Sequence, residues 1–238
     1  MTTRETVILV PGLLCDADVW THQIAALSPL HEVIVPDLTR HDSLQGMAAH
    51  ILDSAPERFS IIGHSMGGRV TLEVFRLAPE RVARIGLLDT GVHPAPPEEL
   101  SKRQAMLDIS AGQGMTALAD AWLPPMVRPG LLDTDPALRT TLYAMVERMT
   151  PAIHRQQITA LINRPDAAPL LSQITCPALV GVGELDQWSP PEQHVPIAEA
   201  IAGAAMVVFE GAGHMAPMEA PDAVNAALLE WMARPVGE

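Results

Sequence analysis

Short apolar runs that end at turn residues recur along the chain. They are four or five residues long and rich in β-branched side chains, which favours buried parallel strands. Between many of them, apolar residues repeat every three or four positions, the spacing of an amphipathic helix. This alternation predicts an α/β fold: a mostly parallel sheet of about six strands flanked by helices. The expected strands cover residues 6–10, 32–36, 59–62, 84–88, 178–182 and 205–209.

Two helices are predicted most clearly. One covers residues 66–77 and is closed by Pro79, because proline cannot continue a helix. The other begins at Pro221, a favoured first helical residue, and ends near Met232. The expected buried faces are Val70, Val74 and Leu77 in the first helix, and Val224, Leu228 and Trp231 in the second.

The strand pattern is absent from residues 93–167, where helical segments alternate with proline and glycine breakers. We therefore expect one α/β core, formed by residues 1–92 and 168–238, with a helical lid inserted at residues 93–167. Asp135 and Thr150 each precede a proline, which predicts two capped helix starts within the lid. An apolar stripe is expected to pack on the core, or alternatively to form a substrate wall, and consists of Leu138, Leu142, Met145 and Met149.

Composition and charge narrow the classes of function. The chain has 238 residues, 48% of them hydrophobic, which is enough for a continuous core. Its formal net charge of −13 disfavours binding to nucleic acid or to an anionic membrane. Cys15 and Cys176 are far apart in a chain too large to need a disulfide, so we expect free thiols. The apolar run at residues 7–10 is too short for a signal or a membrane span, which predicts a cytoplasmic protein.

The sequence Gly63-His64-Ser65-Met66-Gly67 matches the nucleophile-elbow pattern G-x-S-x-G. It lies directly after an expected strand and directly before an expected helix, as that mechanism requires. A Cβ atom at either glycine would crowd the neighbouring strand or helix in so sharp a turn. The helix N-terminus also favours negative charge beside the serine. Ser65 is therefore the candidate nucleophile.

A serine nucleophile needs a base, and the chain has nine histidines. His64 is adjacent to Ser65 on a tight turn, so its side chain is expected to point elsewhere and pack beneath the elbow. His214 follows the last expected strand in a loop that contains Gly211 and Gly213. Such a loop reaches the carboxyl edge of the sheet, where sites of open α/β folds lie. His214 is the candidate base.

Two aspartates are candidates for the acid that orients the base. Asp186 follows the strand at 178–182, and Asp89 follows the strand at 84–88. Asp186 is favoured over the nearby Glu184 and over Asp89, because Gly181 and Gly183 give its loop freedom to turn toward His214. Asp89 is expected instead to cap the turn after its own strand.

The loop after the first strand, Pro11-Gly12-Leu13-Leu14, is expected to supply half of an oxyanion hole. The backbone N–H groups of Leu13 and Met66 would together hold the oxyanion. Cys15 lies close by but has no assigned base, so it is expected to be a small buried hydrophobe.

These motifs together resemble the α/β-hydrolase superfamily, and the resemblance covers almost the whole chain. It implies the α/β-hydrolase fold and a Ser-Asp-His mechanism without fixing the substrate. Two features depart from the family pattern: Pro11 stands where a histidine is usual, and residues 39–43 lack the usual glycines. The chain also begins at the strand before the oxyanion loop, so the family's first two strands are expected to be absent. The matching positions are Val10-Pro11-Gly12, Trp20, Pro36-Asp37, Gly63 to Gly68, Pro79-Glu80-Arg81-Val82, Gly183 to Asp186, His214, Glu219 and Pro221.

The sequence therefore predicts a serine hydrolase that cleaves a small carboxylic ester or lactone. One alternative is a carbon–carbon bond hydrolase or a menaquinone-pathway-type lyase with the same triad. That alternative would need a lid cation in the pocket, and the candidates are Arg128, Arg139, Arg148 and Arg155. A second alternative is a non-catalytic ligand receptor, which the intact triad disfavours.

The substrate pocket is expected to be apolar, since the lid is rich in methionine, and to prefer short or medium acyl chains over charged substrates. We expect no cofactor and no metal. The run at residues 112–117 fits the dinucleotide pattern G-x-G-x-x-A but follows a helical segment rather than a strand. The expected pocket residues are Leu14, Met115, Trp122, Met145, Trp188 and Met215.

Overall fold

The strands form one all-parallel sheet in the order β2-β1-β3-β4-β5-β6, in a computed structural model that describes residues 4–236. This confirms the prediction of an α/β fold with about six parallel strands. Four of the strands, β1, β3, β4 and β5, are buried along their whole length, whereas the edge strands β2 and β6 are only partly buried. Their bounds are β1 Thr6–Val10, β2 Glu32–Ile34, β3 Phe59–His64, β4 Val82–Leu88, β5 Ala178–Gly183 and β6 Ala205–Phe209.

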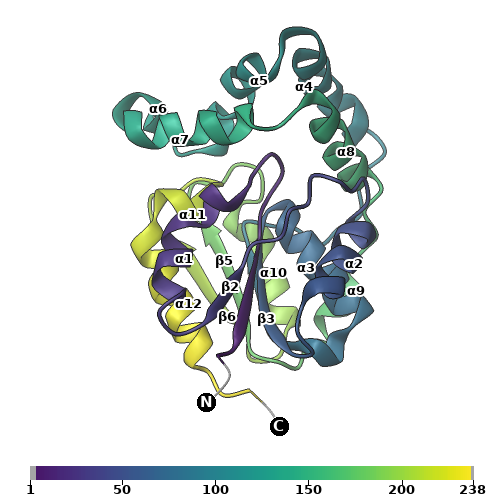
Figure 1. The fold of residues 1–238 in the computed structure, drawn as a ribbon, viewed down its shortest axis with the longest axis vertical. Coiled ribbons are helices and arrows are strands. Elements are labelled where there is room, and N and C mark those ends of the chain that lie inside the picture. Colours follow the sequence, from purple (N-terminus) through teal and green to yellow (C-terminus); the bar gives the residue numbers. More distant parts are fainter. Residues whose placement is uncertain (1–3, 237–238) are drawn as a thin grey trace.

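Helices cover both faces of the sheet (Figure 1). Helices α1 and α12 pack together on one face, and α2 and α3 pack together on the other. Their bounds, with those of the shorter helices beside them, are α1 Thr21–Leu27, α2 Leu44–Ser54, α3 Met66–Leu77, α9 Ala168–Leu171, α10 Pro191–Ala200, α11 Ala216–Glu219 and α12 Pro221–Ala233. Single 3₁₀ turns occupy Ala17–Trp20, Pro79–Arg81 and Pro124–Met126.

The predicted elements differ from the observed ones mainly at their ends. Strand β2 stops at Ile34, two residues before Pro36, whose ring nitrogen has no hydrogen to donate to a ladder. Strand β4 begins at Val82, two residues earlier than predicted. Leu77 was placed on the buried face of α3, but it is the last residue of that helix and half of its surface is exposed. The buried face predicted for α12 is confirmed.

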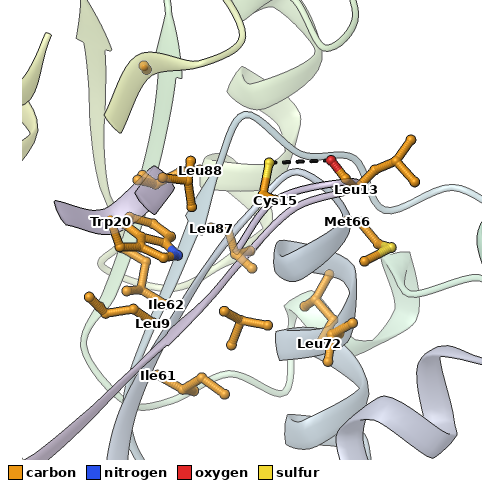
Figure 2. Close-up of a cluster of buried hydrophobic side chains, with 14 of the residues drawn as sticks. Leu9, Leu13, Cys15, Trp20, Ile61, Ile62, Met66, Leu72, Leu87 and Leu88 are labelled. Atoms are coloured by element: carbon orange, nitrogen blue, oxygen red, sulfur yellow. Dashed lines mark hydrogen bonds between the residues drawn. The ribbon is translucent and has the colours of Figure 1, made fainter. Parts of the chain in front are cut away.

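The core beneath the site is built from strand side chains and two neighbouring segments. Figure 2 shows Leu9, Ile62 and Leu88, from three adjacent strands, grouped with the indole of Trp20. Leu72 of α3 belongs to the same cluster. All five side chains are essentially inaccessible to solvent, so the strands that carry the site residues rest on a close-packed support.

The order of the strands determines where a site can form. Strand β2 lies on one side of β1, and the next strand along the chain, β3, lies on its other side. The order in which strands are added to the sheet therefore reverses between β1 and β3. In open α/β sheets, ligands bind outside the carboxyl ends of the strands at such a reversal. The loop at residues 11–16 and the turn at Ser65 meet at this point.

Of the helices between β4 and β5, five, α4 to α8, gather beyond the carboxyl ends of the strands (Figure 1). The helix starts predicted at Asp135 and Thr150 are confirmed: their side chains accept the N–H groups of Leu138 and Ile153. Leu142, Met145 and Met149 of the predicted stripe are buried, and Leu138 packs against the same core. The bounds are α4 Glu99–Gln113, α5 Met115–Trp122, α6 Leu131–Thr134, α7 Pro136–Glu147 and α8 Pro151–Ile162.

Both cysteines are free, as predicted. Cys15 is buried and donates from Sγ to the carbonyl of Leu13 at 3.3 Å (Figure 2). Burial raises the pKa of the Cys15 thiol far above its usual range, so it behaves as an inert small hydrophobe. Among residues 4–236, no helix combines the length and the apolar character needed to cross a membrane.

Candidate active site

Ser65 occupies a sharp turn between β3 and α3. Its backbone has φ +56° and ψ −117°, a conformation that L-residues rarely adopt. The turn depends on the two glycines of the motif: a Cβ atom would lie 2.1 Å from the Gly67 carbonyl oxygen if placed on Gly63, and 2.1 Å from the Val10 carbonyl oxygen if placed on Gly67. The hydroxyl of Ser65 is thereby held at the end of β3, at the N-terminus of α3.

Three side chains form a continuous hydrogen-bonded relay. The Oγ of Ser65 lies 2.8 Å from Nε2 of His214, and Nδ1 of His214 lies 2.7 Å from Oδ2 of Asp186. A carboxylate only accepts, so Nδ1 carries the proton and Nε2 has the free lone pair that accepts from the serine hydroxyl. The arrangement can remove a proton from Ser65 while Asp186 stabilises the resulting imidazolium.

Asp186 is held in its ionised form by hydrogen-bond donors. Its Oδ1 accepts the backbone N–H groups of Trp188 at 2.8 Å and Ser189 at 3.0 Å. Burial raises the pKa of Asp186, but its hydrogen bond to His214 and these two N–H groups outweigh burial and lower it overall. The carboxylate therefore stays charged and keeps the imidazole in the tautomer that the relay needs.

Asp89, the alternative acid, occupies a different position. Its carboxylate is fully buried, and Oδ1 accepts the N–H of Gly183 at 2.8 Å. The side chain thus binds the neighbouring strand β5 and does not cap its own turn as predicted. Burial, and then the charge of Asp186, raise the pKa of Asp89 well above its usual range. Burial and the neighbouring charge of Asp186 therefore both favour the protonated form of Asp89, behind the relay.

The carboxyl oxygens of Asp89 and Asp186 and a ring nitrogen of His214 lie within 4.8 Å of one another, a spacing that suits metal ligands. The relay makes a poor metal site, however. Nδ1 of His214 carries the proton that it donates to Asp186, and burial of Asp89 disfavours its charged form. A metal requires deprotonated ligands.

His64 lies beneath the elbow, as predicted, and it has a contact that the sequence did not reveal. Its Nε2–H donates to the main-chain carbonyl of His214 at 2.6 Å, and its ring meets Trp20 edge-on at 6.3 Å. Burial, with a smaller contribution from His214, lowers the pKa of His64 to about 3, so the ring stays neutral. His64 therefore positions the loop that carries the base.

Two further residues support the relay from behind. Glu219 accepts the N–H of Met215 at 3.1 Å and the N–H of Arg128 at 2.7 Å, which joins the loop of the base to the inserted helical region. Thr90 donates its hydroxyl to the carbonyl of Ser65 at 2.7 Å, which fixes the elbow. Neither role has a local sequence signal, because each depends on a contact distant in the chain.

The loop after β1 is fixed in an unusual conformation beside Ser65. Leu14 has φ +58°, and its N–H donates to Oε1 of Gln157 on α8 at 2.8 Å. Leu13 and Met66, the residues predicted to form the oxyanion hole, both line the pocket that contains Ser65. Met66 begins α3, so its N–H has no partner within the helix.

A pocket of about 470 Å³ opens between the carboxyl ends of the strands and the inserted helices. Of the predicted pocket residues, Trp122, Trp188 and Met215 line it. The other three do not: Leu14 and Met145 are fully buried in the core, and Met115 packs against that core.

One wall of the pocket is charged, which differs from the predicted apolar lining. None of the four arginines considered in the sequence, Arg128, Arg139, Arg148 and Arg155, lines this pocket. Other basic side chains line it instead, with the carboxylate of Glu99 among them; they are Arg69, Lys102, Arg103 and Arg164. The sequence pattern did not predict this charged wall, because its residues come from three segments that are far apart in the chain.

Comparisons with known proteins agree with this architecture. The sequence profile described as "Alpha/beta hydrolase family" matches residues 7–227. Among curated relatives, the 2-hydroxy-6-oxononadienedioate/2-hydroxy-6-oxononatrienedioate hydrolase of Escherichia coli (strain K12) is 24% identical, over 97% of this chain and 88% of the relative.

Two solved structures show the same fold. A thermophilic esterase from Thermogutta terrifontis, with malate bound, has a TM-score of 0.88 and 28% identity, and the match covers 97% of this chain and 90% of the esterase. The enol-lactonase from Burkholderia xenovorans LB400 has a TM-score of 0.86 and 23% identity, with 98% and 92% covered.

Proposed function

Since this chain belongs to the alpha/beta hydrolase family, we propose that it is a serine hydrolase that cleaves a small carboxylic ester or lactone through an acyl-enzyme intermediate. The observation that supports this most directly is the unbroken relay from Ser65 through His214 to Asp186. Serine in a strained strand-to-helix turn, with a base and an orienting acid in line, is the arrangement that nucleophilic acyl transfer needs.

In the proposed reaction, Oγ of Ser65 attacks the carbonyl carbon while its proton passes to Nε2 of His214. The N–H groups of Leu13 and Met66 stabilise the oxyanion, each contributing about 3 kcal/mol to the transition state. Collapse of the tetrahedral intermediate breaks the ester C–O bond, and the leaving alcohol takes the proton from His214. Water then attacks the acyl-enzyme by the same route in reverse and releases the acid and free Ser65.

The inserted helices fit the role of a lid in this proposal. Two contacts join them to the loop after β1: Gln157 accepts the N–H of Leu14, and Arg148 binds the carboxylates of Asp16 and Asp18. A movement of α7 and α8 would therefore also move the proposed oxyanion loop. Closure over the pocket would exclude water while the acyl-enzyme forms.

The test is a substrate panel. Purified protein is assayed with p-nitrophenyl esters from acetate to decanoate, and with several lactones followed by proton release. Hydrolysis of esters or lactones by the wild type, and its loss in Ser65→Ala with an unchanged circular dichroism spectrum, would support the proposal. Activity that persists in Ser65→Ala would overturn it.

A second candidate function is hydrolysis of a carbon–carbon bond by the same relay. The basic wall of the pocket favours it, because arginine and lysine side chains there could bind a carboxylate of a dienedioate-like substrate. The E. coli relative is named for action on dienedioates, although it shares only 24% identity. A vinylogous 1,5-diketone in the substrate panel separates the two candidates: its cleavage, without cleavage of esters, would favour the second.

A further inference from the structure

Three arginines line one wall of the pocket, and two of them pair with the same carboxylate. Glu99 of α4 pairs with Arg103 at 2.7 Å and with Arg164 at 2.7 Å. Its carboxylate is thereby paired with two guanidinium groups. The pair with Arg164 joins α4 to the segment after α8. Structural tethering accounts for Arg103 and Arg164, but it leaves Arg69 unexplained.

Among the described residues, Arg69 forms no ion pair with a carboxylate, and Glu99 acts on it only from a distance. Within residues 4–236, its guanidinium makes one hydrogen bond, from Nη1 to the main-chain carbonyl of His93 at 3.0 Å. Burial, and then the charge of Arg164, lower the pKa of Arg69. A guanidinium nevertheless stays protonated in proteins. The wall therefore holds excess positive charge at a place where water stabilises it poorly.

The location of Arg69 relates this charge to the chemistry. It lies four residues after Ser65, in the first turn of α3, and both residues line the same pocket. The guanidinium extends over Gly91, where an added Cβ atom would lie 2.8 Å from Nη2. Gly91 also lines the pocket, so the absence of its side chain leaves room for the arginine.

We propose that Arg69 binds a carboxylate of the substrate a few bonds away from the carbonyl that Ser65 attacks. The N–H groups of Arg164 are already taken by Glu99 and by main-chain carbonyls, so Arg164 contributes only its nearby positive charge. The inference rests on the proposed function and specifies its substrate class: an ester or lactone that carries a carboxylate. A planar guanidinium fork matches a carboxylate in two parallel hydrogen bonds. The bound anion would balance the charge that Glu99 leaves uncompensated.

The first experiment compares substrates that differ only in this group. Monoethyl glutarate and the ethyl ester of glutaric acid monoamide have nearly the same shape, but only the first is an anion at pH 7.5. The wild type should show a kcat/KM at least tenfold higher for the monoethyl glutarate, because hydrogen bonds between charged groups are stronger than neutral ones. The ethyl ester of 4-phosphonobutyric acid, included as a third substrate, would overturn the carboxylate assignment if it were preferred.

Variants test whether Arg69 causes the preference. In Arg69→Gln the ratio of the two kcat/KM values should fall to near one, and in Arg69→Lys, which keeps the charge but loses the fork, it should be intermediate. Arg155→Met is the matched control, because Arg155 is an exposed arginine on α8 outside the pocket. Its ratio should equal that of the wild type. A wild-type ratio near one, or a ratio unchanged in Arg69→Gln, would overturn the inference.

A binding measurement separates failure of this inference from failure of the proposed function. Glutarate itself should raise the melting temperature of the wild type and of Arg155→Met, and should have at least tenfold weaker apparent affinity for Arg69→Gln. If no ester is cleaved but glutarate still stabilises through Arg69, the proposed reaction is wrong and the carboxylate site stands. If esters are cleaved and glutarate has no Arg69-dependent effect, the reaction stands and the carboxylate site is wrong.

Discussion

The Nε2–H of His64 donates a 2.6 Å hydrogen bond to the main-chain carbonyl of His214, 150 residues further along the chain. The residue that precedes the proposed nucleophile thus holds the backbone of the proposed base. Because β3 and the loop after β6 lie on separate parts of the sheet, this bond fixes their relative position directly. The geometry of the Ser65–His214 pair therefore depends on a side chain that takes no part in proton transfer.

We predict that removing this donor lowers kcat. His64→Leu fills a similar volume without a donor and should reduce kcat at least tenfold, because a small displacement of a catalytic group has a large effect on rate. His64→Gln keeps an N–H donor and should recover much of that loss. KM should change little in either variant. Equal kcat values in the two variants would show that the hydrogen bond does not position the base.

Ser65 should be the residue that a fluorophosphonate probe labels rapidly. Such probes need a serine activated by a base and facing an oxyanion hole, and the relay provides this at Ser65. Intact-protein mass spectrometry should find one adduct in the wild type and none in Ser65→Ala. His214→Ala should label far more slowly with its fold retained. Rapid labelling of Ser65→Ala would place the nucleophile elsewhere.

Asp186 and Asp89 should respond very differently to the same substitution. Asp186→Asn replaces the acceptor of the His214 Nδ1–H and can select the wrong tautomer; the corresponding change in a Ser-His-Asp protease lowers kcat about ten thousand-fold. We expect a loss of several orders of magnitude here. Asp89→Asn resembles the protonated acid that burial favours and should stay within about tenfold of the wild type. The reverse ranking, measured on one ester, would assign the orienting role to Asp89.

Most of the fold was predictable because it depends on local patterns. Every strand predicted from apolar runs is present, and the errors are confined to ends such as Ile34 in β2, where propensity gives little information. The elbow was predictable for a related reason: its glycines and its place between strand and helix are features of a short segment. The approach of Asp186 to His214 follows from the parallel order of β5 and β6.

The charged wall of the pocket was not predictable in this way. Arg69, Glu99 and Arg164 come from α3, α4 and the segment after α8, and no sequence spacing relates them. From the sequence alone, an arginine in a helix is predicted to be exposed to solvent, since most arginines are exposed. Arg69 lines a pocket only because the inserted helices pack over this end of the sheet. The same reason explains why the support from Glu219 was missed.

Gly67→Ala should be severely destabilising, because its Cβ atom would lie 2.1 Å from the backbone oxygen of Val10, which cannot move without disrupting β1. We expect a loss of more than about 3 kcal/mol in the free energy of unfolding, or failure to fold. Gly112→Ala is the control. Gly112 lies within α4 with open space around it, so alanine should stabilise the protein by about 0.5–1 kcal/mol. Urea denaturation distinguishes the two, and a mild effect at Gly67 would contradict the close contact.

Asp89 should make the stability of the protein depend on pH in a direction opposite to that of most carboxylates. In the unfolded chain its pKa lies near the ordinary value of 3.8, whereas burial, and then the charge of Asp186, raise the pKa in the folded protein. The folded state therefore binds one more proton than the unfolded state between these two values. The stabilising contribution of Asp89 is fully present below pH 3.8 and is lost as the pH rises through the folded pKa, by up to about 1.4 kcal/mol per pH unit.

Asp89→Asn should remove this loss. The amide is neutral at every pH, and its oxygen can still accept the N–H of Gly183, so the variant imitates the protonated acid. We expect Asp89→Asn to gain stability relative to the wild type as the pH rises from 5 to 8, measured as the difference in free energy of unfolding by urea. Asp53→Asn, at an exposed position of α2, should show a nearly constant difference over the same range. A constant difference for Asp89→Asn as well would mean that Asp89 is ionised in the folded protein, and that two negative carboxylates lie side by side behind His214.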